Sequence, residues 1–162
     1  MARIVQKFGG TSVGDVERIK NVALKVKAEI DLGNEVAVVL SAMSGETNRL
    51  IDLVNQIGSL HDACEYDTVV ATGEQVTIGL LALALHDLGV SARSWLGWQV
   101  QFHTDDIHTK ARIQKIDVSE LDKRMKSGEV PVVAGFQGIG TDKRITTLGR
   151  GGSDTSAVAL AA

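Results

Sequence analysis

A continuous apolar run, Val36-Ala37-Val38-Val39-Leu40, constrains the fold of this chain more than any other feature. A run without polar alternation is typical of a strand that is covered on both faces. Before it come apolar residues at helical spacing (Val16, Ile19, Ala23, Val26 and Ile30) and, earlier still, a short β-branched segment at Arg3–Gln6. Strand, helix and strand in this order form a right-handed crossover unit. The pattern therefore predicts a parallel sheet.

The rest of the chain continues the alternation of helical and strand-like segments. Apolar residues at Leu50, Leu53, Val54 and Ile57 mark a second helix that ends near Gly58. The further expected elements are a long apolar helix at Asp67–Leu88 interrupted by Thr72-Gly73-Glu74, a strand and its exit at Ser91–Trp98, a helix at Asp117–Lys126, a buried strand at Val130–Phe136 and a hairpin or loop at Gly138–Arg144. Such alternation predicts an α/β fold, a three-layer αβα sandwich around a mainly parallel sheet. Ligands of such sheets bind beyond the carboxyl ends of the strands.

Polar residues and glycines indicate where the helices begin and end. Ser12 and Asp15 are possible N-caps of the first helix, and Gly33 is its expected stop. Asp117 and Glu120 have the spacing of a capping box. The last segment, from Thr155, begins an apolar helix and then stops without a cap or a polar face. We therefore expect one domain, residues 1–162, truncated at its C-terminus; a frayed Ala-rich tail is the alternative.

Composition narrows the class of protein. The net charge of −3 does not indicate binding to nucleic acid or to an anionic membrane surface. Cys64 is the only cysteine, so no intrachain disulfide can form and a reducing cytoplasm fits; a small packed residue is its expected role. The longest apolar stretch near the middle, Ile78–Leu85, is too short to span a bilayer, and we expect a soluble protein.

A lysine and a double glycine follow the first strand, in Lys7-Phe8-Gly9-Gly10-Thr11-Ser12. Two glycines let the backbone approach a ligand closely and turn N–H groups toward it. The helix that follows adds a positive dipole end, and the Lys7 ammonium adds a full charge. This is not the Walker arrangement, because the lysine precedes the glycines. The turn predicts a phosphate cradle, and an ordinary βα turn with a solvated lysine is an equally open interpretation.

Three glycine-rich turns follow strand-like runs, at Gly9-Gly10, Ser44-Gly45 and Gly149–Gly152. Turns of this kind meet at one edge of a parallel sheet, and backbone nests attract phosphate. Together with Lys7 and with the Arg150 and Asp154 side chains, they predict an anion site.

Five motifs, in order along essentially the whole chain, resemble those of the aspartate kinases of the amino acid kinase superfamily. The first and last are highly specific and the middle ones are supportive. The motifs are Lys7-Phe8-Gly9-Gly10-Thr11-Ser12-Val13, Val39-Leu40-Ser41-Ala42-Met43, Thr72-Gly73-Glu74, Val133-Ala134-Gly135-Phe136-Gln137-Gly138 and Thr147-Leu148-Gly149-Arg150-Gly151-Gly152-Ser153-Asp154. The segment before Asp67 resembles the monofunctional enzymes more than those fused to homoserine dehydrogenase.

The resemblance implies ATP-dependent phosphorylation of the side-chain carboxylate of L-aspartate, with Mg²⁺ bound through the nucleotide phosphates. This reaction gives 4-phospho-L-aspartate and opens lysine, threonine and methionine biosynthesis. The resemblance also implies a cytoplasmic homo-oligomer. Family members continue past the terminal helix with an adenine- and ribose-binding segment and regulatory ACT domains. We therefore expect the 162-residue chain alone to be inactive or very weakly active.

The resemblance also implies a role for individual residues. Lys7 would contact the transferring phosphoryl group, and Asp154 would orient Lys7. Glu74 would take the substrate ammonium, and Arg150 would clamp a substrate carboxylate with its planar fork. The phosphates would lie on Gly9, Gly10, Gly151 and Gly152, and the aspartate pocket would be lined by Ser41, Thr47, Phe136 and Ser153; no residue is assigned to a metal.

Each assignment has a purely structural alternative. Glu74 and Arg150 could face solvent, while Asp154 and Thr47 could be helix N-caps. His103 and His108, near Asp105 and Asp106, fix no metal geometry and are expected in a solvated loop. Trp95 and Trp98 are expected to pack rather than to stack on a base.

Other functions stay open beside the first. The chain could belong to a glutamate, acetylglutamate or UMP kinase of the same superfamily, although Glu74 and Arg150 favour a free amino acid. It could also be an amino-acid- or nucleotide-sensing module without turnover. A dinucleotide-binding domain is disfavoured, because no correctly framed GxGxxG follows the first strand and no helix follows Gly138-Ile139-Gly140.

Overall fold

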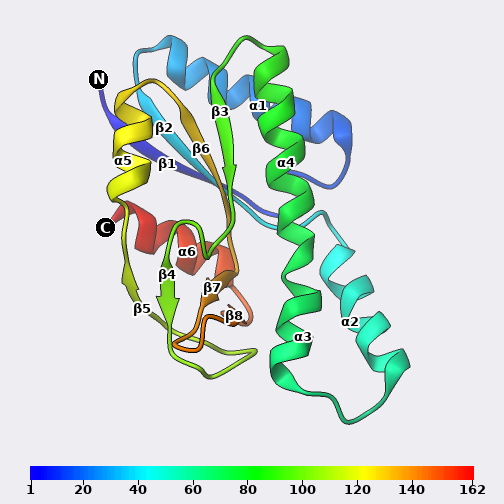
Figure 1. Ribbon diagram of the computed structural model, residues 1–162. Helices are drawn as coiled ribbons and strands as arrows, with labels where there is room; N and C mark the ends of the chain where they lie inside the picture. Colours follow the sequence, from blue (N-terminus) through cyan, green and yellow to red (C-terminus); the bar gives the residue numbers. More distant parts are fainter.

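The computed structural model describes residues 1–162 as alternating strands and helices (Figure 1). The strands are β1 (Arg3–Phe8), β2 (Glu35–Leu40), β3 (Ala92–Trp95), β4 (Phe102–Thr104), β5 (Ile113–Ile116), β6 (Val130–Ala134), β7 (Gln137–Ile139) and β8 (Ile145–Thr147). The helices are α1 (Val16–Asp31), α2 (Glu46–Ile57), α3 (Ala63–Val70), α4 (Thr72–Asp87), α5 (Ser119–Lys126) and α6 (Gly152–Ala161).

The main sheet has the strand order β1-β2-β6-β3, and every pair in it is parallel. This confirms the parallel sheet expected from the β1–α1–β2 crossover. Pro131 lies in the central strand β6 but precedes the stretch that pairs with β2, which begins at Val38 opposite Val132. The missing N–H of the proline is therefore outside that ladder.

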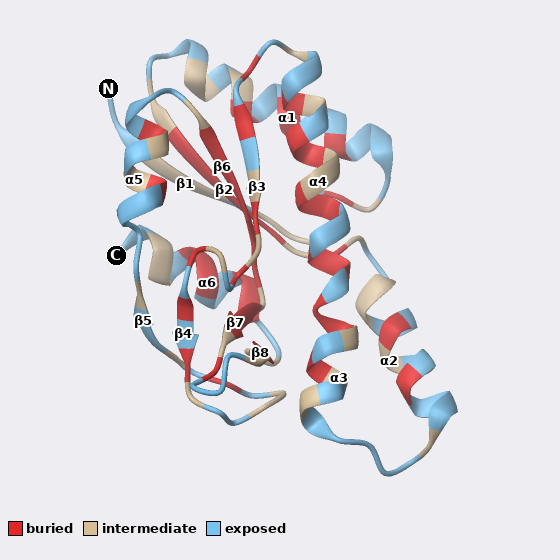
Figure 2. Cartoon of the chain, in the orientation of Figure 1, coloured by how far each residue is buried: buried red, intermediate tan, exposed pale blue.

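Helices cover both faces of the main sheet, and this explains its continuous apolar strands (Figure 2). Alternate residues of β2 point to opposite faces: Val36, Val38 and Leu40 pack in the cluster that holds α1 and α4. Val39, together with Val133 of β6, packs in the cluster that holds residues of α5, α6 and β4. The predicted three-layer αβα arrangement is confirmed.

A second, smaller sheet was not predicted. Its order is β5-β4-β7-β8, with antiparallel β4–β5 and β7–β8 pairs and a parallel β4–β7 pair. The β7–β8 pair is the hairpin expected at Gly138–Arg144, whereas β4 and β5 have no apolar run or clear alternation to identify them. These short strands depend on their partners and on Phe102, which is fully buried against the main sheet.

The long apolar helix begins earlier than predicted and is interrupted at a different residue. The Asp62 carboxylate accepts hydrogen bonds from the N–H groups of Cys64 and Glu65, so α3 begins at Ala63. The interruption is at Ala71, and Thr72-Gly73-Glu74 is itself the first turn of α4. By length and composition, Ala63–Asp87 is apolar enough to cross a membrane, which differs from our expectation for this region. Half of its most apolar window is buried inside the fold.

The helix ends predicted from the sequence agree with the structure at α1 and differ from it at α5 and α6. Asp15, not Ser12, caps α1 by accepting from the Arg18 N–H at 2.8 Å, and Gly33 takes a left-handed φ of 82° after the helix. The expected capping box of α5 is absent, because Asp117 accepts from the Ser119 N–H instead of that of Glu120. Helix α6 begins at Gly152 rather than at Thr155.

The burial of residues on α4 predicts how much two substitutions change the free energy of unfolding. Leu81 is fully buried, whereas Val76 on the same helix is 50% exposed. We expect Leu81→Ala to lower the free energy of unfolding by about 2–5 kcal/mol, because it removes apolar contacts and leaves a cavity. Val76→Ala, the control on the same helix, should change it by less than about 0.5 kcal/mol. Urea titration of both variants measures the difference, and equal losses would contradict the assigned core.

Candidate active site

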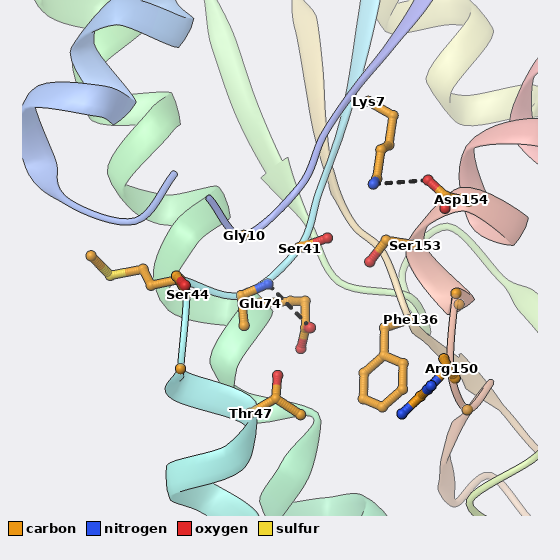
Figure 3. Close-up of a pocket in the computed structure, with 16 residues that line it drawn as sticks. Lys7, Gly10, Ser41, Ser44, Thr47, Glu74, Phe136, Arg150, Ser153 and Asp154 are labelled. Carbon is orange, nitrogen blue, oxygen red and sulfur yellow. Dashed lines mark hydrogen bonds and ion pairs between the residues drawn. The ribbon is translucent and has the colours of Figure 1, made fainter. Parts of the chain in front are cut away.

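A cavity of about 310 Å³ opens where the glycine-rich turns follow β1, β2 and β8 (Figure 3). Its position beyond the carboxyl ends of β1 and β2 is the one expected for a ligand site in a parallel sheet. The lining residues are Lys7, Gly10, Ser41, Ala42, Met43, Ser44, Gly45, Thr47, Glu74, Phe136, Gly149, Arg150, Gly151, Gly152, Ser153 and Asp154.

Strand β1 and helix α6, the first and last elements of the chain, meet at this cavity. The Lys7 Nζ atom lies 2.8 Å from Oδ1 of Asp154, an ion pair between the end of β1 and the first turn of α6. The Lys7 side chain is 29% exposed and Asp154 is 70% exposed, so the pair lies at the rim. Lys7 is thereby held over the cavity, where its ammonium can meet an anion. Asp154 is not the N-cap of α6, because that position is Gly151.

The turns after β1 and β2 are packed against each other at the cavity wall. The Ser44 N–H donates to the Gly10 carbonyl at 3.2 Å. A Cβ at Gly10 would lie 3.0 Å from the Ala42 carbonyl oxygen, so a side chain there would force the turns apart. Gly9 does not line the cavity, although a Cβ at this position would lie 3.4 Å from Lys7 Nζ.

Helix N-termini add positive potential on two sides of the cavity. Gly45 and Gly151 are the N-caps of α2 and α6, with φ of 82° and 75°. Neither has a side-chain cap. The first N–H of each helix bonds to a backbone carbonyl, at Met43 for α2 and at Gly149 for α6, but the next two N–H groups of each helix have no partner and stay available to a ligand. Thr47 is in the first turn of α2 and lines the cavity, and the alternative that it caps this helix is wrong.

Glu74 supplies a buried carboxyl group. Glu74 is only 2% exposed, so the alternative that it faces solvent is wrong. Oε1 accepts one hydrogen bond, from the Ala42 N–H at 3.3 Å, and Oε2 has no partner. Burial raises the pKa of this carboxyl to about 8, against the smaller lowering effect of its backbone hydrogen bonds. A cation entering the cavity would find an acceptor that the protein leaves unused.

Phe136 and Arg150 form the opposite wall. Phe136 has a φ of 71°, unusual for a residue with a side chain; its N–H donates to Ser156 Oγ at 3.1 Å and its carbonyl accepts from the Leu148 N–H at 2.9 Å. Arg150 is exposed, lies between two glycines of positive φ and makes no ion pair within the chain. Its guanidinium is therefore free to bind a carboxylate.

Close glycine contacts bring this wall together. A Cβ at Gly135 would lie 2.8 Å from Cβ and Oγ of Ser153, and one at Gly152 would lie 2.9 Å from Phe136 Cδ2. The end of β6 and the start of α6 approach each other because these side chains are missing. Ser153 is thereby buried beneath the cavity, with 9% of its surface exposed.

The structure thus brings together all the predicted site residues except Gly9. Sequence reasoning did not assign Ala42, Met43, Ser44, Gly45 and Gly149 to the site, although the glycine turns indicated most of them. The predictions for His108 and Trp98 are wrong: the side chain of His108 is 9% exposed, and Trp98 is 47% exposed rather than packed. Trp95 is buried, as expected, Cys64 is only half-buried, and His103 is exposed on β4 rather than in a loop.

The amino acid kinase family matches residues 2–162, and the chain belongs to this family. Within it, the chain is 61% identical to an aspartate kinase of Stutzerimonas stutzeri (strain A1501) over 162 residues, which are 100% of this chain and 39% of that protein. The chain therefore spans about two fifths of the length of this relative.

Solved structures give the same grouping. Aspartate kinase from Synechocystis has a TM-score of 0.82 and 48% identity, over 98% of this chain and 26% of its own. Aspartokinase III of E. coli, in a complex with aspartate and ADP, has a TM-score of 0.81 and 26% identity, and the match covers 99% of this chain and 46% of that one. The expected fold class and the resemblance to aspartate kinases are confirmed.

Proposed function

We propose that the polypeptide containing this chain transfers the γ-phosphoryl group of ATP to the side-chain carboxylate of L-aspartate. One observation carries the proposal most: an unpartnered, buried Glu74 oxygen and an unpaired Arg150 lie in the same cavity as the Lys7–Asp154 pair. A free amino acid has an ammonium for the first and a carboxylate for the second. Relatives named aspartate kinase, and the neighbour that holds aspartate and ADP, support the choice of substrate.

The proposed reaction needs positioning and charge rather than a base. A side-chain carboxylate oxygen of aspartate attacks the γ-phosphorus, the bond from phosphorus to the β,γ-bridging oxygen breaks, and ADP leaves with the electron pair of that bond. Lys7 would stabilise the negative charge on the transferring group, and Asp154 would hold the ammonium in place. The phosphates would lie on the Gly10 turn and at the N-terminus of α6, with Gly9 assigned only through its closeness to Lys7.

Mg²⁺ belongs to the proposal through the nucleotide. No group of three or more His, Cys, Asp and Glu side chains in residues 1–162 is arranged to hold a metal ion. The phosphate oxygens would therefore be the main ligands of Mg²⁺, which commonly keeps several waters in such sites. Bound there, the ion would neutralise charge on the β- and γ-phosphates.

The wider biology is proposed on the same basis. Aspartyl phosphate would be the entry to lysine, threonine and methionine biosynthesis, in the cytoplasm. Self-association is supported by an apolar hollow between α1 and α4, lined by Val16, Leu24, Leu80, Leu83 and Leu88 among others. Leu24 and Leu83 are more than half exposed there, as is common at contacts between subunits.

A substrate panel tests the function. The complete polypeptide, given Mg·ATP, should form an acyl phosphate with L-aspartate, trapped as its hydroxamate. It should do so at least about 100-fold less efficiently with N-acetylglutamate or UMP, because neither offers Glu74 an ammonium group. L-Glutamate keeps its ammonium but is one methylene longer, and it should react about 10–200-fold less efficiently. Preference for N-acetylglutamate would favour the other kinases of the superfamily. Binding of aspartate without any phosphoryl transfer would favour a sensing module.

A further inference from the structure

Two separate parts of the fold carry the residues proposed to bind the amino acid. The helical stretch α3–α4 carries Glu74, while the second sheet carries Phe136 before β7 and Arg150 after β8. The spacing between the buried carboxyl and the guanidinium therefore depends on how firmly the sheet is attached to the helices. Helix α3 packs directly on β8.

Asp67 attaches α3 to the second sheet through several hydrogen bonds. It is fully buried, and its Oδ1 and Oδ2 accept from Thr147 Oγ1 at 2.7 Å and from the Thr147 N–H at 3.0 Å. Oδ2 also accepts from the Thr109 N–H at 3.1 Å and lies 2.8 Å from His108 Nδ1. Buried charge is costly unless it is hydrogen-bonded, and here one carboxyl group joins a helix, a loop and the end of β8.

This network continues to the turn that carries Arg150. Thr147 is the last residue of β8, and its carbonyl accepts from the Ala111 N–H at 2.9 Å. Gly149 has a φ of 77°, and a Cβ there would lie 3.1 Å from the Thr109 carbonyl oxygen. Asp67 therefore fixes both the strand from which the turn leaves and the loop against which the turn rests.

A second attachment lies beside Phe136. Gln137 is 2% exposed, and its Nε2 donates to the Ala71 carbonyl at 2.9 Å, where α3 gives way to α4. Its Oε1 accepts from the Gly97 N–H at 3.1 Å. The interruption at Ala71, close to Glu74, is thus held to the same sheet that holds Phe136.

We infer that Asp67 is a positioning residue for substrate binding, which acts through Thr147 to set the separation between Glu74 and Arg150. The inference rests on the proposed function, since it assigns the two ends of an amino acid to these two groups. It adds that the contact between Asp67 and Thr147, two residues that do not line the cavity, determines the affinity for the amino acid and the discrimination between amino acids of different length.

Thr147 and its neighbour Thr146 provide a matched pair of variants. Both are buried on β8, and each hydroxyl makes one 2.7 Å hydrogen bond. The Thr147 hydroxyl bonds to Asp67 on α3, whereas that of Thr146 bonds to Thr104 within the second sheet. Valine at either position removes one buried hydrogen bond and nearly conserves side-chain size. Only Thr147→Val weakens the attachment between the sheet and the helix.

The experiment compares steady-state kinetics of the complete enzyme and the two variants. Thr147→Val should raise the KM for aspartate about tenfold and reduce the preference for aspartate over glutamate. Its kcat and its KM for ATP should stay within about twofold, and Thr146→Val should leave all of these within about twofold of wild type. Asp67→Asn, if it folds, should raise the aspartate KM further.

Equal effects of Thr147→Val and Thr146→Val on the aspartate KM would overturn the inference, as would a loss confined to kcat or to melting temperature. These outcomes leave the proposed function intact if the wild type phosphorylates aspartate. A wild type that does not phosphorylate aspartate would overturn the proposed function, and this inference with it. If Asp67→Asn does not fold, the comparison of the two threonine variants decides alone.

Discussion

Replacing Lys7 with methionine should lower kcat for aspartate phosphorylation by about 10²–10³-fold, the usual loss when one preorganised charge is removed from a transition state. The Lys7 ammonium is held by Asp154 at 2.8 Å and faces the cavity. Methionine keeps the length and much of the shape of the side chain but cannot stabilise the transferring phosphoryl group. Affinity for aspartate should change by less than about threefold, because Glu74 and Arg150 remain.

Lys27→Met is a suitable control for the Lys7 variant. Lys27 makes an ion pair of the same kind, 2.7 Å from Asp31, with a side chain 35% exposed against 29% for Lys7. It lies on α1, outside the cavity lining. Single-turnover measurements should show a normal rate for this control. A Lys7→Met enzyme that transfers phosphate at the wild-type rate would exclude the proposed role of Lys7.

Affinity for aspartate should depend on pH through Glu74. Burial raises the pKa of this carboxyl to about 8, so the free protein holds it mostly neutral at pH 7. Pairing with an ammonium requires the ionised form. Affinity should therefore rise about tenfold per pH unit between pH 6 and 7.5 and level off above pH 8, with release of a proton on binding. Titration calorimetry in two buffers of different ionisation enthalpy measures that proton.

Glu74→Gln should weaken aspartate binding by about 100-fold and abolish this pH dependence. The variant should also alter stability in a defined direction. The neutral carboxyl favours the folded state, so this contribution is complete below the ordinary glutamate pKa of 4.5 and is lost as the pH rises through about 8. The glutamine variant should lack this decline. Glu17→Gln, an 80% exposed side chain on α1, is the control for both measurements. If the affinity of the wild type for aspartate does not change between pH 6 and pH 8, the assigned role of Glu74 is contradicted.

The main sheet was predictable because the apolar pattern of its strands indicates directly which of their faces are covered. The run Val36–Leu40 has no polar face, and a strand of this kind requires cover on both sides. The glycine turns were predictable as well, since Gly45 and Gly151 adopt left-handed backbone conformations that few other residues tolerate. These local signals located most of the cavity.

The second sheet and its attachments were not predictable, because they depend on partners remote in the sequence. Strands β4 and β5 are short, and exposed residues such as Gln114 and Lys115 give no apolar pattern. In the sequence, Asp67 and His108 are two ordinary polar residues, and only the fold places Oδ2 of Asp67 2.8 Å from Nδ1 of His108. The left-handed conformation of Phe136 is likewise imposed by Ser156 and Leu148, which bond its backbone from other elements.

A crystal structure of the complete protein with L-aspartate and a non-hydrolysable ATP analogue tests the central claim most directly. We expect the substrate ammonium at Oε2 of Glu74, the α-carboxylate on the fork of Arg150, and the terminal phosphate beside Lys7. Aspartate bound elsewhere, with that Glu74 oxygen still without a partner, would contradict the proposed site.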